Sequence, residues 1–275
     1  MKCGYVAVLG QPNAGKSSLV NYLVGEEVAI VSHRRQTTRN SILGIKNGKN
    51  YQIIFVDTPG IHHSTNKLDK YMMKNVRNAV ASADVALYLF DGTKPLEEEE
   101  LEYIKMLKTK CENVILLRTK GDKKQQNFDV DALEISVKNG ENLQKLEKQI
   151  VSLLPDREAV YDEELYTDKS VKFLIAEKAR GYLLENIDQE IPHGVAVVVS
   201  RFDEIDSIAA IDLDIICERD QHKGIIIGKG GQTIKKMGQE TRKYAEDLLQ
   251  KKCVVKLFVK VDKDWRNKDI ARYGY

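Results

Sequence analysis

The sequence has little of what marks secreted, metal-binding or membrane proteins. Its four cysteines, Cys3, Cys111, Cys217 and Cys253, are far apart and include no CxxC pair, which favours reduced thiols over a disulfide framework or a zinc site. The five histidines also lack metal-ligand spacing. No stretch approaches the roughly 18 apolar residues of a membrane span, and the N-terminus has no signal-peptide pattern. We therefore expect a soluble, cytoplasmic protein.

The length and the charge distribution indicate two parts of different character. With 275 residues the chain is long for one domain, so two are the better expectation. The net charge of +2 hides a division: residues 161–222 hold 6 basic against 15 acidic side chains, and residues 223–275 hold 14 against 6. Clustered positive charge is typical of a polyanion-binding surface, although a solvated basic face gives the same pattern.

The first 155 residues alternate short apolar runs with longer amphipathic ones. Apolar runs this continuous predict strands buried on both faces, hence a parallel sheet between layers of helices in an α/β domain. Ligands of such sheets bind at the carboxyl ends of the strands. The predicted strands are residues 5–10, 51–57, 85–91 and 113–120.

The remainder of the chain predicts a linker and a smaller α/β domain. Residues 153–170 are polar and acidic and show no sustained period, which is typical of a linker. Thr167 or Asp168 could cap the helix that follows. The further elements expected are a helix at 171–187, strands at 194–202 and 209–218, a helix at 232–250 and a strand at 253–261. We divide the chain into residues 1–160, an acidic linker and long helix at 161–190, and residues 191–275.

The segment after the first predicted strand, "GQPNAGKS", fits the P-loop pattern G-x-x-x-x-G-K-S. Its glycines let backbone N–H groups surround phosphate oxygens at a helix N-terminus, while Lys16 reaches the β- and γ-phosphates and Ser17 binds Mg²⁺. The pattern alone does not distinguish ATP from GTP. The nucleotide-binding candidates here are Gly10, Gln11, Pro12, Asn13, Ala14, Gly15, Lys16, Ser17 and Ser18.

Three further motifs follow strands in the same order along the chain. In "DTPG", Asp57 can hold Mg²⁺ through water and the Gly60 N–H can sense the γ-phosphate. In "TKGD", the Asp122 carboxylate can accept hydrogen bonds from guanine N1 and N2, a donor pair that adenine lacks. The candidates in these motifs are Asp57, Thr58, Pro59, Gly60, Ile61, Thr119, Lys120 and Asp122, with Ser136 and Val137 of "ISVKNG" close to the base.

Together with "RRQTTRNSILGI" at residues 34–45, these motifs resemble the Era family of translation-factor-related GTPases. The resemblance implies an enzyme that hydrolyses GTP to GDP and phosphate. It also implies that Thr37 or Thr38, of which we favour Thr38, completes the Mg²⁺ shell with Ser17 and Asp57. Lys16, Thr38 and Gly60 are then the candidate catalytic residues.

The sequence departs from the family pattern in the guanine motif. Thr119 stands where the family has Asn, and Val137 stands where it has Ala. Ile61 occupies the place of a water-orienting Gln in Ras-like enzymes, and an apolar side chain cannot align the attacking water. We therefore expect slow intrinsic hydrolysis, aided by K⁺ near Asn13 as in similar GTPases with Asn at this position.

A second glycine turn, "GKGG" at residues 228–231, is too short for a P-loop. It fits the backbone clamp of a KH domain, where glycines let an RNA backbone come close. Ile225, Ile226, Ile227 and Ile234 are expected to line an apolar groove for unstacked bases. Trp265 could stack on a base or pack in the core. The RNA-binding candidates are Ile227, Gly228, Lys229, Gly230, Gly231, Ile234, Lys235 and Lys236.

The ending "KVDKDWRNKDIARYGY" also looks like the Era C-terminus, so the resemblance covers essentially the whole chain. It implies a P-loop GTPase domain followed by a type II KH domain, and binding to the 3′ region of 16S rRNA in assembly of the 30S subunit. It also implies a monomer with peripheral inner-membrane association. Two alternatives are an RNA-binding assembly protein that hydrolyses GTP negligibly and an ATP-dependent RNA-linked enzyme.

The Thr119 and Val137 departures generate a first prediction. Because Asp122 is retained and the Val137 contact comes from the backbone, we expect guanine specificity to survive with reduced affinity. Competition binding of GDP and ADP to the purified protein measures this. Equal affinities for the two nucleotides would refute it.

Overall fold

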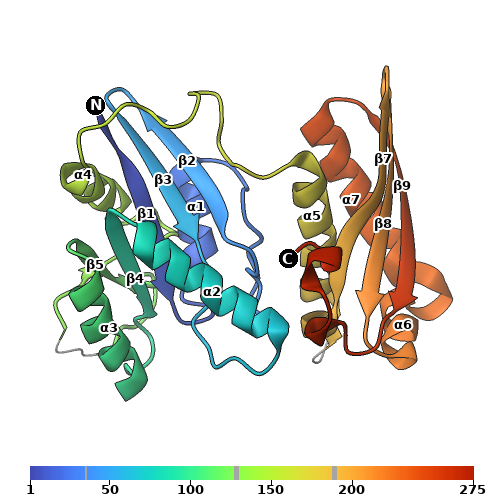
Figure 1. Ribbon diagram of the computed structural model, residues 1–275, viewed down its shortest axis with the longest axis horizontal. Coiled ribbons are helices and arrows are strands. Elements are labelled where there is room, and N and C mark those ends of the chain that lie inside the picture. The colour runs from blue at the N-terminus through green and yellow to red at the C-terminus, as the bar shows by residue number, and fades with distance from the viewer. Residues whose placement is uncertain (35, 127–129, 188–190) are drawn as a thin grey trace. The chain divides into compact units, whose positions relative to one another are not determined.

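The structure, a computed structural model, describes residues 1–34, 36–126, 130–187 and 191–275 (Figure 1). Residue 35 of the segment 34–45 therefore lies outside the described residues. The chain divides into two units. The first comprises residues 1–31, 38–63 and 72–168, and the second comprises residues 32–37, 64–71 and 169–275. Each unit is described separately.

The apolar runs of the first unit form a sheet with the order β2-β3-β1-β4-β5-β6 over the described residues. Its strands are β1 (Lys2–Gly10), β2 (Ile42–Gly48), β3 (Tyr51–Asp57), β4 (Val85–Asp91), β5 (Val114–Thr119) and β6 (Leu133–Glu134). All neighbours pair in parallel except β2, which is antiparallel to β3. The four predicted strands and the mostly parallel sheet are thus confirmed, whereas β2 and β6 were not predicted.

Helices cover both faces of this sheet (Figure 1). α2 (Lys67–Ser82) and α3 (Glu98–Lys110) pack on one face, where Val76 and Leu107 join Ala7, Tyr88 and Leu116 in a buried cluster. α1 (Lys16–Val24) and α4 (Leu143–Leu153) lie on the other. Burial on both faces explains why the central strands are apolar throughout.

The segment predicted to be a linker is hydrogen-bonded along the first unit. The buried Gln52 amide oxygen accepts from the backbone N–H groups of Val160 and Tyr161, and Thr167 forms a bridge to Gly44 of β2. The Asp168 carboxylate accepts from the Leu43 N–H at 3.1 Å. Thr167 and Asp168, which were predicted to cap the helix, instead pair with residues of β2, so that prediction was wrong.

The cap is Ser170 instead, whose hydroxyl accepts from the Phe173 N–H at 3.3 Å to begin α5 (Val171–Asn186). The second unit continues with β7 (Ala196–Ile205), β8 (Ile208–Cys217), α6 (Asp220–Ile227), α7 (Gln232–Leu249) and β9 (Lys252–Val261). β8 pairs antiparallel with β7 and parallel with β9. Except for α6, these elements match the prediction.

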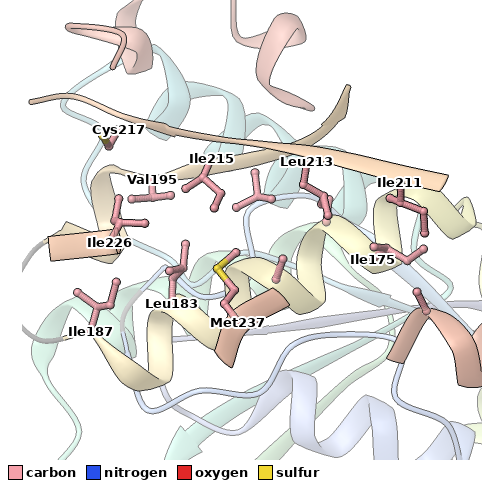
Figure 2. Close-up of a cluster of buried hydrophobic side chains, with 14 of the residues drawn as sticks. Ile175, Leu183, Ile187, Val195, Ile211, Leu213, Ile215, Cys217, Ile226 and Met237 are labelled. Atoms are coloured by element: carbon pink, nitrogen blue, oxygen red, sulfur yellow. The ribbon is translucent and has the colours of Figure 1, made fainter. Parts of the chain in front are cut away.

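The core of the second unit lies between α5, α7 and one face of the sheet. Figure 2 shows Ile175 and Leu183 of α5 and Met237 of α7 directed toward Leu213 and Ile215 of β8. No helix among the described residues of either unit is both long and apolar enough to cross a membrane. All four cysteines are free and buried, as expected for structural thiols.

Candidate functional site

The first candidate site lies at the carboxyl edge of the first sheet. β1 ends at Gly10, β3 at Asp57, β4 at Asp91 and β5 at Thr119. Because these strands are parallel and adjacent, their ends meet at one edge. The motifs that the sequence analysis selected one by one are thus brought together.

The two glycines of the P-loop have different structural roles. A Cβ on Gly10 (φ +140°) would lie 2.1 Å from the Leu89 carbonyl oxygen, so packing against β4 requires glycine there. Gly15 (φ +91°) has open space where a Cβ would be and is the N-cap of α1, with no side-chain cap among the described residues. The first N–H groups of α1 thus face a position suited to an anion.

Lys16 is folded back over this loop. Its Nζ donates to the carbonyl oxygens of Gly10 at 3.1 Å and Gln11 at 2.9 Å. Burial lowers the pKa of Lys16 to about 8, and the nearby Asp57 carboxylate opposes that shift. The ammonium group of Lys16 thus lies at the glycine loop, where it could pair with the negative charge of a bound phosphate.

Two hydroxyls and one carboxylate converge beside the loop. The Ser17 hydroxyl donates to Asp57 Oδ2 at 2.7 Å, the Thr38 hydroxyl lies 3.3 Å from the same oxygen, and the two hydroxyls are 2.9 Å apart. Burial raises the pKa of Asp57 to about 6, although hydrogen bonds and Lys16 counteract it. Asp57 Oδ1 is buried and has no hydrogen-bond partner within the described residues. This all-oxygen set fits a small hard cation such as Mg²⁺.

The two neighbouring threonines differ in what their hydroxyls contact. Thr37 Oγ1 donates to the Arg34 carbonyl oxygen at 2.7 Å, whereas Thr38 Oγ1 reaches the carboxylate of Asp57. The DTPG segment is fixed nearby, because the Thr58 hydroxyl donates to the Val8 carbonyl and the Ile61 N–H to the Gly10 carbonyl.

The guanine-motif residues gather at the end of β5. The buried Ser136 hydroxyl donates to Asp122 Oδ1 at 3.0 Å, and the Gly121 N–H donates to the Ile135 carbonyl. Thr119 donates its hydroxyl to the Phe90 carbonyl oxygen at 3.1 Å. Lys120 lies 2.5 Å from Asp91, a residue that the sequence analysis did not select.

The second candidate site is the glycine turn between α6 and α7. Gly228, Gly230 and Gly231 all have positive φ, and no atom of the described residues lies within 4 Å of a Cβ built on Gly230 or Gly231. Gly231 is the N-cap of α7, again with no side-chain cap in the part of the chain that the structure describes. Lys229, Lys235 and Lys236 are exposed around the turn.

The predicted apolar wall of this site needs correction. Ile225–Ile227 belong to α6 rather than to an extended run, so their side chains point in different directions. Ile226 is fully buried in the core and cannot face a ligand, Ile225 is 47% exposed, and Ile227 and Ile234 are half-buried. Trp265 is also fully buried, and its Nε1–H donates to the Gly194 carbonyl, so it packs in the fold and does not stack on a base.

Comparison with known proteins covers both sites. A family model described as 50S ribosome-binding GTPase matches residues 5–120, and a KH domain model matches residues 190–266. The chain is 39% identical to GTPase Era of Clostridium acetobutylicum over 100% of this chain and 98% of that protein. It is 40% identical to GTPase Era of Alkaliphilus metalliredigens over 100% and 99%.

Two solved structures are similar over the whole chain. A variant of Aquifex aeolicus Era bound to GDP and AlF₄⁻ has a TM-score of 0.94 at 33% identity, covering 100% of this chain and 99% of that one. Era in complex with MgGDPNP and nucleotides 1506–1542 of 16S ribosomal RNA has a TM-score of 0.93 at 34% identity, with the same coverage.

The geometry of the second glycine turn generates a prediction about two neighbouring glycines. A Cβ on Gly228 (φ +76°) would lie 2.2 Å from Thr233 Oγ1, whereas one on Gly224, within α6, would meet none of the described residues within 4 Å. We expect Gly228→Ala to destabilise the protein by about 1–3 kcal/mol. Gly224→Ala should be neutral or stabilising by about 0.5–1 kcal/mol, because alanine favours the helix.

Chemical denaturation of the two variants and the parent chain measures both effects. A Gly228→Ala protein as stable as Gly224→Ala would show that the turn does not need glycine at position 228.

Proposed function

Since this chain belongs to the Era family of GTPases, whose members match it over its full length, we propose that it binds the single-stranded 3′ region of 16S rRNA and acts in assembly of the 30S ribosomal subunit. The family establishes the protein as a GTP-hydrolysing enzyme with a C-terminal KH domain that binds RNA. It thus favours hydrolysis over the two alternatives, binding without turnover and dependence on ATP.

The observation that carries the RNA proposal is the open backbone of Gly230 and Gly231. Within the part of the chain that the structure describes, nothing lies within 4 Å of a Cβ built on either glycine, and exposed lysines lie in the turn and directly after it. A sugar–phosphate chain can therefore approach the main chain closely, as a KH clamp requires. The similar Era structure bound to nucleotides 1506–1542 of 16S rRNA supports this choice of RNA.

For the nucleotide site we propose roles that follow the geometry. Backbone N–H groups of residues 10–18, apart from Pro12, bind the phosphates, with Lys16 supplying a positive charge that favours the negative oxygens. Ser17, Thr38 and Asp57 hold Mg²⁺, which when bound offsets the charge on the β- and γ-phosphates. Asp122 and Lys120 recognise guanine.

Slow intrinsic turnover is part of the same proposal. Ile61 is fixed through its N–H to Gly10, and its apolar side chain cannot orient an attacking water. Water must then be positioned by backbone groups such as the Gly60 N–H. K⁺ near Asn13, a monomeric state and peripheral inner-membrane association of a cytoplasmic protein remain predictions that derive from the family resemblance.

The RNA proposal is tested with an oligonucleotide that carries the 3′ end of 16S rRNA. In the double variant Lys235→Gln/Lys236→Gln, we expect the slope of log K against log salt to become shallower by about 1.4, since each phosphate contact on a single strand contributes about 0.7. Lys145→Gln/Lys148→Gln removes two exposed lysines from α4 and serves as the matched control. An unchanged slope in the first variant, or an equal change in both, would contradict the proposed site.

Crosslinking to total cellular RNA in the presence of GTP or GDP, followed by sequencing of the bound fragments, tests which RNA is the target. Fragments enriched in the 3′ region of 16S rRNA support the proposal. Enrichment of unrelated RNA would overturn it.

The metal site gives a separate prediction about the threonine pair. Thr38→Ala removes a hydroxyl next to Asp57 and should lower multiple-turnover phosphate release by about 100-fold, because charge on the γ-phosphate is less well stabilised. Thr37→Ala removes only a contact to the Arg34 carbonyl and should change the rate by about twofold or less. The apparent Mg²⁺ affinity, measured by titrating Mg²⁺ while a non-hydrolysable GTP analogue binds, should be weaker in Thr38→Ala but not in Thr37→Ala. Equal decreases of the phosphate-release rate in the two variants would contradict the assignment of Thr38 as the Mg²⁺ ligand.

A further inference from the structure

The loop that follows β5 is anchored to the end of β4 in a way that the motif does not reveal. Thr119, which replaces the family's Asn, is buried and donates its hydroxyl to the Phe90 carbonyl oxygen at 3.1 Å. The single hydrogen of this hydroxyl is used in that contact, so Thr119 cannot also donate to another part of the site. Thr119 therefore ties the start of the base-recognition loop to β4, and any further anchoring of the loop comes from other groups.

Lys120 is also held by β4, through the carboxylate of Asp91. Its backbone has a φ of +63°, in the left-handed region, and its Nζ lies 2.5 Å from Asp91 Oδ2. The other carboxylate oxygen of Asp91 accepts from the Thr93 N–H at 3.0 Å and from the Thr93 hydroxyl at 2.6 Å. Both oxygens of Asp91 are thus engaged, which fixes the direction in which the carboxylate meets the ammonium group.

The surrounding main chain makes this arrangement rigid. The Gly92 N–H donates to the Thr119 carbonyl at 3.2 Å, and the Gly92 carbonyl accepts from the Gln126 N–H at 2.8 Å. The Gln125 amide donates to the Lys120 carbonyl at 2.6 Å. A Cβ on Gly92 would lie 1.7 Å from Gln125 Oε1, so a larger residue there would displace the Gln125 side chain from its present position.

We propose that Asp91 is a positioning residue for guanine recognition: its carboxylate holds the Lys120 ammonium group so that the aliphatic part of that side chain forms one wall of the base site. With Thr119 and Gln125 it replaces the anchoring that an Asn amide at position 119 would give. This inference rests on the proposed roles of Lys120 and Asp122 in binding guanine.

The charge state of Asp91 is consistent with this role. Burial opposes ionisation, but hydrogen bonds from Lys120 and Thr93 outweigh it and hold the pKa of Asp91 below its ordinary value. The carboxylate is therefore ionised at neutral pH. An ionised partner keeps the lysine directed to one place, which lowers the conformational entropy that base binding would otherwise remove.

Asp91→Asn is the direct test, because it keeps the shape of the side chain and removes the charge. We expect GDP to bind about tenfold more weakly, as for loss of a hydrogen bond between charged groups. In steady-state assays the KM for GTP should change more than kcat. Asp91→Glu, which restores the charge, should recover part of the affinity.

Asp84→Asn is a matched control, because Asp84 immediately precedes β4 and Asp91 is the last residue of that strand. Asp84 has a similar side-chain exposure, 17% against 14% for Asp91, and its ion pair with Arg157 is equally short at 2.5 Å. The two substitutions should therefore cost similar thermal stability, whereas Asp84→Asn should leave the Kd for GDP unchanged. A GDP affinity of Asp91→Asn equal to that of Asp84→Asn would overturn the inference.

A double-mutant cycle shows whether Asp91 acts through Lys120. Lys120→Met removes the ammonium group and keeps most of the aliphatic stem. If Asp91 serves only to hold that group, Asp91→Asn should have no further effect on GDP affinity in the Lys120→Met background. A full loss in that background would contradict the proposed route.

The failure of this inference is distinguishable from failure of the guanine site itself. Wild-type protein that binds ADP as tightly as GDP would refute guanine recognition and the role of Asp91 with it. Wild-type protein that selects GDP, together with an Asp91→Asn variant of unchanged affinity, would refute only the role of Asp91.

Discussion

The parallel register of β3, β1, β4 and β5 is the constraint on which the nucleotide site depends. It pairs Val8 with Asp57, Gly10 with Leu89, and Asp91 with Thr119. Phosphate, metal and base contacts come from different strands, so their distances are set by this register rather than by any single motif. A slip of one residue in one strand would turn the side chains of that strand to the opposite face of the sheet. Because helices pack on both faces, the slip would disrupt the side-chain packing of the core and destabilise the fold. The hydrophobic core of the first unit thus determines the geometry of its polar edge.

Burial also explains which strands could be predicted from the sequence and which could not. Strands such as β4 are apolar throughout and were predicted, whereas β2 is an edge strand that carries Lys46 and Asn47 and directly follows a polar loop. α6 was missed because three consecutive isoleucines resemble an extended run, although in a helix only Ile226 among them is fully buried. Local composition does not show which of three apolar neighbours a tertiary core will cover.

The site shows a similar limit. The P-loop and guanine-motif residues were identifiable because their spacing along the chain reflects the chemistry they perform. Asp91 was not, since its contact with Lys120 joins residues 29 positions apart and exists only because β4 and β5 are neighbours. The same reasoning accounts for the helix cap, because Asp168 is a good capping residue by type but is engaged by the Leu43 N–H. Partners of this kind come from topology, which no short pattern encodes.

Glycine serves two physical purposes in this chain, and the structure separates them. At Gly10 and Gly228 a side chain would collide with neighbouring atoms of the protein, so these glycines are needed for the fold. At Gly15, Gly230 and Gly231 the space is open and φ is positive, so the backbone there can be approached from outside. Gly15 and Gly231 are also N-caps that offer no side-chain oxygen to α1 and α7. In both units a helix N-terminus therefore lies behind bare main chain, where the partial positive charge of its N–H groups favours phosphate. One chain can thus use the same local device for a nucleotide and for an RNA strand, with selectivity supplied by the residues around each turn.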